Sequence, residues 1–483
     1  MSETAIISVV LVVYLTLLIG IAVWSRSAGG SLEGYYLGGR RLPFWVAGFS
    51  ANATGESSWL LLGLSGMGYL LGIHAIWIVV GETLGILLGW QLIARHLKPR
   101  ADSFGSITVP DFLEDALEDK THRLRICGIF IILTMVAAYV SAQMMATGKI
   151  FSTFLPMEYS TGVLLGGAIT MAYTAYGGFK AVAYSDVLQG ILMLLALVSL
   201  PIVGIYAIQG DFWQAIRETD PALLDPMGGL GLSVPGLIAV VGFIMLGFAF
   251  MAAPQLLTRF MAIKSADEIK SAAWISTICI ILFDTGAVLT GMAGRVLFPD
   301  VPDVETVMPT MARELLPPLI TGVFLVMVLA AVMSTVDSLL ILASSAVVRD
   351  LMQKVLNIGW QDAQLARFGM FVTVAIGVGA MAFALTEIKV IFWFVVFAMS
   401  GLSAAFGPTV ICALFYKGIT KEGALAGMVG GFATDMIWVT FIRERTHDLV
   451  EVVPATIVSF ALIFVVSRAT RNYSHAKSSS PTA

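Results

Sequence analysis

Thirteen long apolar stretches recur along the chain, and they constrain its fold more than any other feature. A helix needs about 20 apolar residues to cross the roughly 30 Å hydrocarbon core of a bilayer. Stretches of that kind cover approximately 5–24, 43–65, 69–93, 126–152, 158–177, 184–208, 232–252, 272–296, 317–345, 367–386, 389–416, 420–441 and 449–467. With 58% hydrophobic and only 12% charged residues, the chain has too little polar surface to coat a water-soluble body. The sequence therefore predicts an all-α integral membrane protein with thirteen transmembrane helices.

The distribution of lysine and arginine predicts how the chain is oriented. If the N-terminus lies outside, about three quarters of the 28 Lys and Arg residues fall in cytoplasmic loops, as the positive-inside rule requires. We therefore expect a multi-pass protein of the cell inner (plasma) membrane with the N-terminus outside and the C-terminus cytoplasmic. Residues 1–467 are predicted to form a single transmembrane domain, and the polar segment 468–483 a disordered cytoplasmic tail. A net charge of -4 with scattered basic residues argues against a nucleic-acid partner.

The segment 50–59, SANATGESSW, places an amide, hydroxyls, a glycine and a carboxylate inside an otherwise apolar stretch. Polar or irregular backbone survives at membrane depth only where it is buried in protein or lines a wet cavity. The segment therefore predicts a helix interrupted around a bound ion or solute. A second interruption is expected at 247–254, where a glycine and a terminal proline free backbone groups. The two breaks stand five spans apart, as expected for two five-helix repeats of opposite topology.

The ninth span carries an oxygen-lined face. Ala331, Ser334, Thr335 and Ser338 recur at helical spacing, and the carboxylate of Asp337 lies next to them. Hard cations such as Na⁺ prefer hydroxyl, carbonyl and carboxylate oxygens. A stripe of small residues can also be a tight seam between helices. The carboxylate favours the ion site, because a packing seam has no need of one.

Acidic residues also occur where lipid or apolar protein would be expected. A charge at the bilayer centre costs at least roughly 2.5 to 3.5 kcal/mol, so such residues face a cavity, a partner or an ion. The acids inside or at the rim of predicted spans are Glu56, Glu82, Asp186, Asp284, Asp337 and Asp435. For Asp284 and Asp435, which stand alone in sequence, a helix-end residue or a protonated, hydrogen-bonded acid is an equal alternative.

Several other classes of membrane protein are disfavoured. The sequence has no phosphate-binding loop of an ATP-driven pump and no pore-loop signature of a channel. Its five histidines are dispersed, so neither a nucleophile–base pair nor a metal cluster of an enzyme is indicated, and we expect no enzymatic activity. A proton-coupled carrier is the main alternative to a sodium-coupled one, since Glu56, Asp186 and Asp337 could relay protons. A sensor that binds solute without moving it is a further alternative.

Seven short stretches, in order along the chain, resemble the sodium:solute symporter family and, within it, the sodium/proline symporter branch. They are YYLGGR (35–40), SSWLLLG (57–63), YTAYGGF with SD (173–179, 185–186), a proline followed by RFM (254, 259–261), AAVMST (330–335), AAFGP (404–408) and GALAG (423–427). The resemblance implies a LeuT-like fold of inverted five-helix repeats with one extra helix before and two after. The first helix would be 5–24, the repeats 43–208 and 232–416, and the extra helices 420–467.

The resemblance also implies binding residues. The principal Na⁺ site would use backbone oxygens of Ala53, Glu56 and Ala331 with the hydroxyls of Ser334 and Thr335. A possible second Na⁺ site would use Asp186, Asp337 and Ser338. The solute would lie near Ser57, Trp59, Tyr139, Phe250 and Pro254, with Glu82 either meeting its ammonium group or pairing with a neighbour.

The implied function is secondary active import of a small organic solute, with L-proline as the leading candidate, driven by downhill Na⁺. The sequence departs from the proline branch at Gly55, where that branch carries an aspartate, and at Leu246 and Phe250, where it carries a tryptophan and a tyrosine. Another small amino acid or an organic acid, coupled to Na⁺ or to H⁺, therefore stays open as the cargo.

Overall fold

The computed structural model describes residues 2–25, 31–386, 391–446 and 449–478. Almost all of these residues are helical. The described part of the chain contains one isolated bridge, between Leu42 and Ile263, and no strand. The predicted all-α class is therefore confirmed.

The described residues form nineteen α-helices in order along the chain. They are α1 (Glu3–Ser25), α2 (Leu32–Leu37), α3 (Phe44–Gly55), α4 (Ser65–Leu71), α5 (Ile76–Leu88), α6 (Arg95–Phe104), α7 (Val109–Ala116), α8 (Arg123–Phe154), α9 (Tyr159–Ala207), α10 (Phe212–Thr219), α11 (Val234–Ala252), α12 (Pro254–Ala262), α13 (Ile269–Leu297), α14 (Val307–Leu315), α15 (Pro318–Ser345), α16 (Asp362–Ala384), α17 (Ile391–Phe415), α18 (Lys421–Ile437) and α19 (Val452–Ser478). The described residues also include four π-helical segments. Trp59–Leu64 leads into α4, and Gly89–Ala94 joins α5 to α6. Ala346–Val355 extends α15, and Trp438–Ile442 extends α18.

The helices make thirteen membrane crossings. Among the described residues, 11 helical runs are long and apolar enough to cross a bilayer. Two of these runs, Trp59–Phe104 with 46 residues and Tyr159–Ala207 with 49, are too long for a single crossing. Each is interrupted by a glycine with left-handed backbone, Gly72 at φ 58° and Gly178 at φ 62°. Dividing the two runs at these glycines gives the thirteen crossings expected from the sequence.

Two expected boundaries differ from the structure. The third crossing was expected at 69–93, but the second crossing continues to Leu71 and the third runs from Ile76 to Phe104. Hydropathy cannot place this boundary, because apolar residues continue on both sides of Gly72. The last helix continues to Ser478, so the segment after 467 begins as helix rather than as the expected disordered tail. Residues 479–483 of that expected tail lie outside the described residues.

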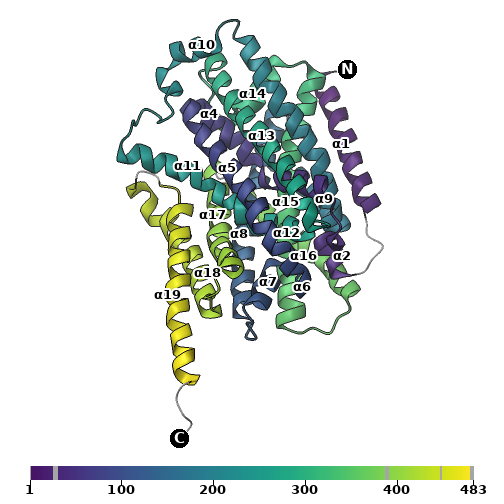
Figure 1. Ribbon diagram of the computed structural model, residues 1–483. Coiled ribbons are helices and arrows are strands. Elements are labelled where there is room, and N and C mark those ends of the chain that lie inside the picture. The colour runs from purple at the N-terminus through teal and green to yellow at the C-terminus, as the bar shows by residue number, and fades with distance from the viewer. Residues whose placement is uncertain (1, 26–30, 387–390, 447–448, 479–483) are drawn as a thin grey trace.

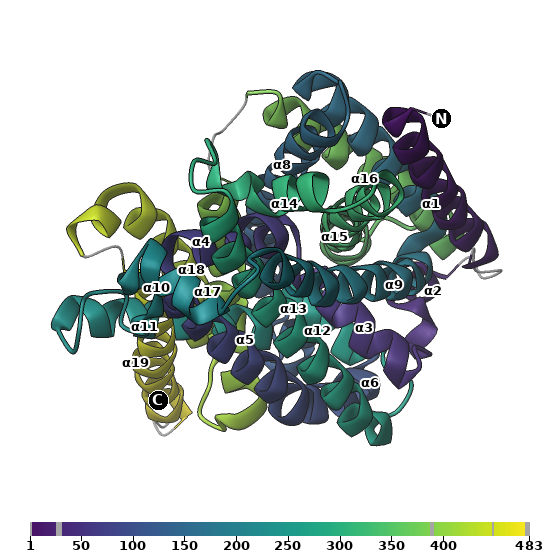
Figure 2. The same cartoon turned by 90° about the horizontal axis from the view of Figure 1, so that it is seen from above.

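The crossings form one bundle with α15 in its interior. Figure 1 shows the two ends of the chain at opposite ends of the bundle, as an odd number of crossings requires. Seen from above, α1, α8, α9 and α16 surround α15, and all four contact it (Figure 2). From Phe324 to Ser345 every residue of α15 is buried. Polar groups on this helix therefore face protein rather than lipid.

Both predicted helix breaks are present. The helix α3 ends at Gly55, Glu56 has extended backbone at φ −84° and ψ 113°, and the helix resumes at Trp59. In the second half of the chain, α11 and α12 are separated by Ala253, which is extended at φ −65° and ψ 137°. Pro254 begins α12 and has no N–H to continue the α11 ladder. The breaks leave carbonyl groups of α3 and α11 free to accept other donors.

Close backbone contact joins the two halves beside these breaks. The helices α5 and α11 pack against each other through glycines. A Cβ atom added at Gly85 would lie 1.8 Å from the carbonyl oxygen of Gly247, and one at Gly81 would lie 2.3 Å from that of Ile244. No other residue type allows backbones to approach so closely. This contact fixes α5, and with it Glu82, next to the broken helix α11.

Candidate functional site

The hydroxyl face of α15 meets the end of α3 at its break. Ser334 Oγ donates to the carbonyl oxygen of Ala53 at 2.6 Å and to that of Ala331 at 2.9 Å. Thr335 Oγ1 donates to the carbonyl oxygen of Thr54 at 3.0 Å and to that of Ala331 at 3.4 Å. All five residues are completely buried. Three carbonyl and two hydroxyl oxygens from two helices therefore converge on one point.

This donor set fits a hard monovalent cation. Every ligand is a neutral oxygen, and both hydroxyls can turn their hydrogens away to present lone pairs to an ion. The structure brings together four of the five residues expected here: Ala53, Ala331, Ser334 and Thr335. The carbonyl of Thr54 is an addition, which the neighbouring position of Ala53 at a helix end could have suggested. The same face also forms the packing contact between α15 and α3, so it serves as a helix seam as well.

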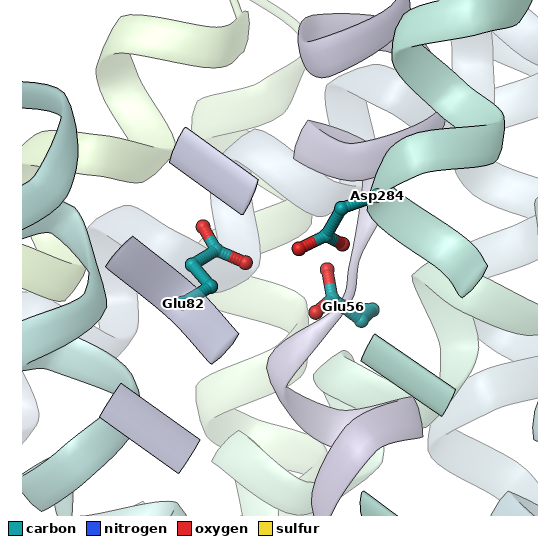
Figure 3. A group of neighbouring side chains, drawn as sticks. All are labelled: Glu56, Glu82 and Asp284. Carbon is teal, nitrogen blue, oxygen red and sulfur yellow. The ribbon is translucent and has the colours of Figure 1, made fainter. Parts of the chain in front are cut away.

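Glu56 differs from the other expected residues. Its backbone N–H donates to the carbonyl oxygen of Asn52 at 2.7 Å, which closes the last turn of α3. Its carboxylate points toward Glu82 and Asp284 (Figure 3). The side chain of Glu56 therefore belongs to a separate acidic cluster. Sequence reasoning treated Glu56, Glu82 and Asp284 one by one and missed that they meet.

The residues expected at a second Na⁺ site lie together, but an arginine lies among them. The guanidinium of Arg259, from α12, donates to Asp186 Oδ2 at 3.2 Å and also to Ser338 Oγ. Ser50 Oγ donates to the same Asp186 oxygen at 2.6 Å. Asp337 is held instead by neutral donors, Tyr173 OH at 2.7 Å and the Ser338 hydroxyl at 3.2 Å. Arg259, noticed in the sequence only as part of a motif, thus supplies the positive charge beside Asp186.

A small, largely apolar pocket lies between the two broken helices. Its walls are Trp59, Glu82, Leu246, Ala249, Phe250, Val395, Val396, Met399 and Ser400. The rings of Trp59 and Phe250 stand edge to face with centroids 6.0 Å apart. Three residues expected at the solute site, Trp59, Glu82 and Phe250, therefore share this pocket. The contribution of α17 was missed, because nothing in its apolar sequence marks the four residues that face the pocket.

The other expected solute residues lie beside the break rather than on these walls. Ser57 Oγ accepts from Tyr139 OH at 3.5 Å and from Gln143 Nε2 at 3.1 Å. Gln143 Oε1 in turn accepts from the backbone N–H of Ser58 at 3.1 Å. Tyr139 and Gln143 of α8 therefore satisfy polar groups that the break exposes. Pro254 lies at the start of α12 and is not among the pocket residues.

Gly55 and Phe250 are linked by shape. A Cβ atom at position 55 would lie 2.7 Å from Cε1 of the Phe250 ring. The Gly55 carbonyl also accepts from Trp59 Nε1 at 3.2 Å, which orients the indole over the pocket. Gly55 and Phe250 are both positions at which the sequence departs from the proline branch. These two departures are coupled, because the absence of a side chain at Gly55 makes room for the ring of Phe250.

Comparisons with known proteins agree with this architecture. A family model described as the sodium:solute symporter family matches residues 35–431. The chain is 37% identical over 467 residues to the high-affinity proline transporter PutP of Bacillus subtilis (strain 168), covering 95% of this chain and 97% of that one. It is 31% identical over 479 residues to a sodium/proline symporter of Staphylococcus aureus, and the match covers 96% of this chain and 92% of that one.

Solved structures share the fold at low sequence identity. A Na⁺-coupled sialic acid symporter, in a substrate-bound outward-open state, superposes with a TM-score of 0.82 at 17% identity over 97% of this chain and 98% of that chain. MhsT in complex with L-phenylalanine superposes with a TM-score of 0.54 at 15% identity, over 88% of this chain and 98% of that chain. The inverted five-helix repeats with one helix before and two after are thereby confirmed as the fold.

Proposed function

Because the chain belongs to the sodium:solute symporter family, we propose that it imports L-proline by coupling its entry to Na⁺ moving down its gradient. One observation carries the proposal. The oxygens of Ala53, Thr54, Ser334 and Thr335 converge at the break of α3, and the pocket of Trp59 and Phe250 lies beyond the same break. Proline transport by two relatives, as their names state, supports the choice of solute.

The proposed coupling follows from linkage. A Na⁺ ion that joins α3 to α15 orders the break, and the break carries Trp59 into the solute pocket. If each ligand raises the affinity for the other, both do so by the same factor. An inward-negative potential of 100 mV contributes about 2.3 kcal/mol for each charge moved, and the Na⁺ gradient adds to it. Alternating access would then come from one bundle rocking against the other, with the breaks at Gly55 and Ala253 as hinges.

The topology completes the proposal. The chain is proposed to lie in the plasma membrane with its N-terminus outside and its C-terminus in the cytoplasm, because lysine and arginine are enriched in the loops that this orientation makes cytoplasmic. Residues 43–208 and 232–416 are proposed as the two inverted repeats, with 420–467 as the extra helices. A second Na⁺ ion at Asp186, Asp337 and Ser338 is the weaker part of the proposal, because Arg259 already neutralises Asp186.

Uptake by purified protein in liposomes tests the function. We expect radiolabelled proline to accumulate when an inward Na⁺ gradient is imposed, and not when choline replaces Na⁺. A panel of unlabelled small amino acids and organic acids as competitors identifies the preferred solute. Accumulation driven by a proton gradient in choline buffer would contradict Na⁺ coupling. Binding of proline without accumulation would indicate a sensor.

A further inference from the structure

Three carboxylates from three different crossings meet beside the break of α3. Glu56 follows the last turn of α3, Glu82 lies on α5 and Asp284 on α13. One oxygen from each lies within 4.8 Å of one oxygen of the other two. Figure 3 shows the three side chains pointing toward one another from three separate segments of the chain. We call these residues the acidic triad.

The triad is buried, and no hydrogen-bond donor or ion-pair partner outside the cluster is found for it among the described residues. Glu56 and Asp284 are completely buried, and Glu82 is 1% exposed. Five carboxylate oxygens, both of Glu56, both of Asp284 and Oε2 of Glu82, accept no hydrogen bond. None of the ion pairs found in the described ranges involves a triad residue. One oxygen of each residue faces the other two residues, so a common partner would lie between the three side chains.

Bare carboxylates cannot persist in such a place. Like charges this close in a medium of low dielectric repel strongly, and a buried ion without a partner costs several kcal/mol. The triad must therefore hold positive charge from outside the protein. The three oxygens lie within 4.8 Å of one another, which is close enough for a hard cation with metal–oxygen distances of about 2.4 Å to bridge two of the carboxylates and lie beside the third.

The triad adjoins the solute pocket. Glu82 is both a triad member and a wall of the pocket formed with Trp59 and Phe250. Glu56 is joined through the extended residues of the break to Ser57 and Trp59. A cation held by the triad therefore lies next to the pocket, and its charge acts directly on the residues that shape the pocket.

We propose that the acidic triad binds a small monovalent cation, Na⁺ or H⁺, that is co-transported in addition to the Na⁺ at Ser334 and Thr335. The inference rests on the proposed function of the chain as a cation-coupled importer. A bound cation offsets part of the negative charge of the triad, weakens the repulsion between α3, α5 and α13 and favours closure of the three helices around the solute. Without the cation the stronger repulsion disfavours this closed, buried arrangement, so closure depends on a second bound charge.

Few other ionisable groups act on the triad. From α8, the Tyr139 hydroxyl lies 3.5 Å from Ser57 Oγ, next to Glu56. From α12, Arg259 is engaged by Asp186 at 3.2 Å. The pocket residues contributed by α11 and α17 are not titratable. The triad therefore responds to its own cation rather than to a neighbouring base.

Cation binding to the purified, solute-free protein tests the proposal. Radioactive Na⁺ bound per chain is measured at saturation, and proton uptake is followed with a pH dye over about pH 5 to 9, where buried acids titrate. We expect two cations per chain in the unaltered protein. Two bound Na⁺ identify sodium as the triad's ligand, whereas one Na⁺ plus one proton that titrates in the unaltered protein but not in Asp284→Asn identifies the proton.

Variants assign each cation to its site. Glu82→Gln and Asp284→Asn should each reduce the two cations to one and leave the Na⁺ at Ser334 in place. The paired variant Ser334→Ala with Thr335→Ala should remove the other. Asp435→Asn, which alters a buried acid on α18, is the control and should keep two. One bound Na⁺ in the unaltered protein, together with a proton titration that Asp284→Asn leaves unchanged, would overturn the proposal.

The test separates this inference from the proposed function. Because binding is measured without solute, a wrong choice of proline does not affect it. If Na⁺ fails to drive uptake of any solute in liposomes while two cations still bind, the transport function is lost and the triad site stands. If uptake is driven by Na⁺ with one charge moved per neutral solute, transport stands and the triad is not a coupling site.

Discussion

At the scale of single residues, the hydroxyls of α15 are the groups on which sodium coupling depends. Replacing Ser334 and Thr335 by alanine removes two of the converging oxygens but leaves the helix intact, since alanine favours helix. We expect Na⁺-driven proline uptake to fall at least about tenfold, equivalent to roughly 1.4 kcal/mol. The initial rate of radiolabelled proline uptake into liposomes measures this fall. Ser345→Ala, which removes a hydroxyl bonded only within α15, is the matched control, and an equal loss in both variants would contradict a sodium role.

The pair formed by Gly55 and Phe250 makes a second prediction at this scale. Gly55→Ala places a Cβ atom 2.7 Å from the Phe250 ring and forces that ring to move into the pocket. We expect weaker solute affinity, seen as a higher KM for uptake. Phe250→Leu should recover part of that loss in the Gly55→Ala background, because the smaller side chain leaves room for the methyl group. Additive losses in the double variant would show that the two positions act independently.

At the scale of elements, glycines decide how α5 meets α11. A methyl group at Gly85 would overlap the carbonyl of Gly247 at 1.8 Å, and neither backbone can move without separating the helices. We expect Gly85→Ala to lower the thermal stability of the detergent-purified protein and to displace Glu82. Fluorescence-detected unfolding measures the change. Gly379→Ala on α16, where nothing lies within 4 Å, is the control and should be neutral or slightly stabilising.

Elements also show what sequence can and cannot predict here. The thirteen crossings follow from apolar length, and the break in α3 follows from polar residues that lipid would not tolerate. The hydroxyl face of α15 is visible as a helical period in the sequence. The acidic triad is not visible, because α3, α5 and α13 come together only by tertiary packing. Arg259 beside Asp186 was missed for the same reason, since the two residues come from α12 and α9.

At the scale of the whole molecule, sodium should stabilise the folded protein. A ligand that binds only the folded state adds about 2.7 kcal/mol when its concentration is one hundred times its Kd. The ion at Ser334 and Thr335 would hold together α3 and α15, which belong to the two different repeats proposed above. We therefore expect the midpoint of thermal unfolding to rise with Na⁺ concentration and to stay constant when choline is added at equal ionic strength.

The variants divide this stabilisation between the two proposed cation sites. The Ser334→Ala, Thr335→Ala double variant should lose the Na⁺ effect that comes from the α3–α15 site. If the triad takes Na⁺, Asp284→Asn should reduce the remaining rise; if it takes a proton, the same variant should change only how stability depends on pH. If the midpoint of thermal unfolding still rises with Na⁺ in a variant that carries all three substitutions, the ion binds elsewhere. Sodium coupling would then have to depend on groups outside both clusters, with Asp186 and Asp337 as the next to examine.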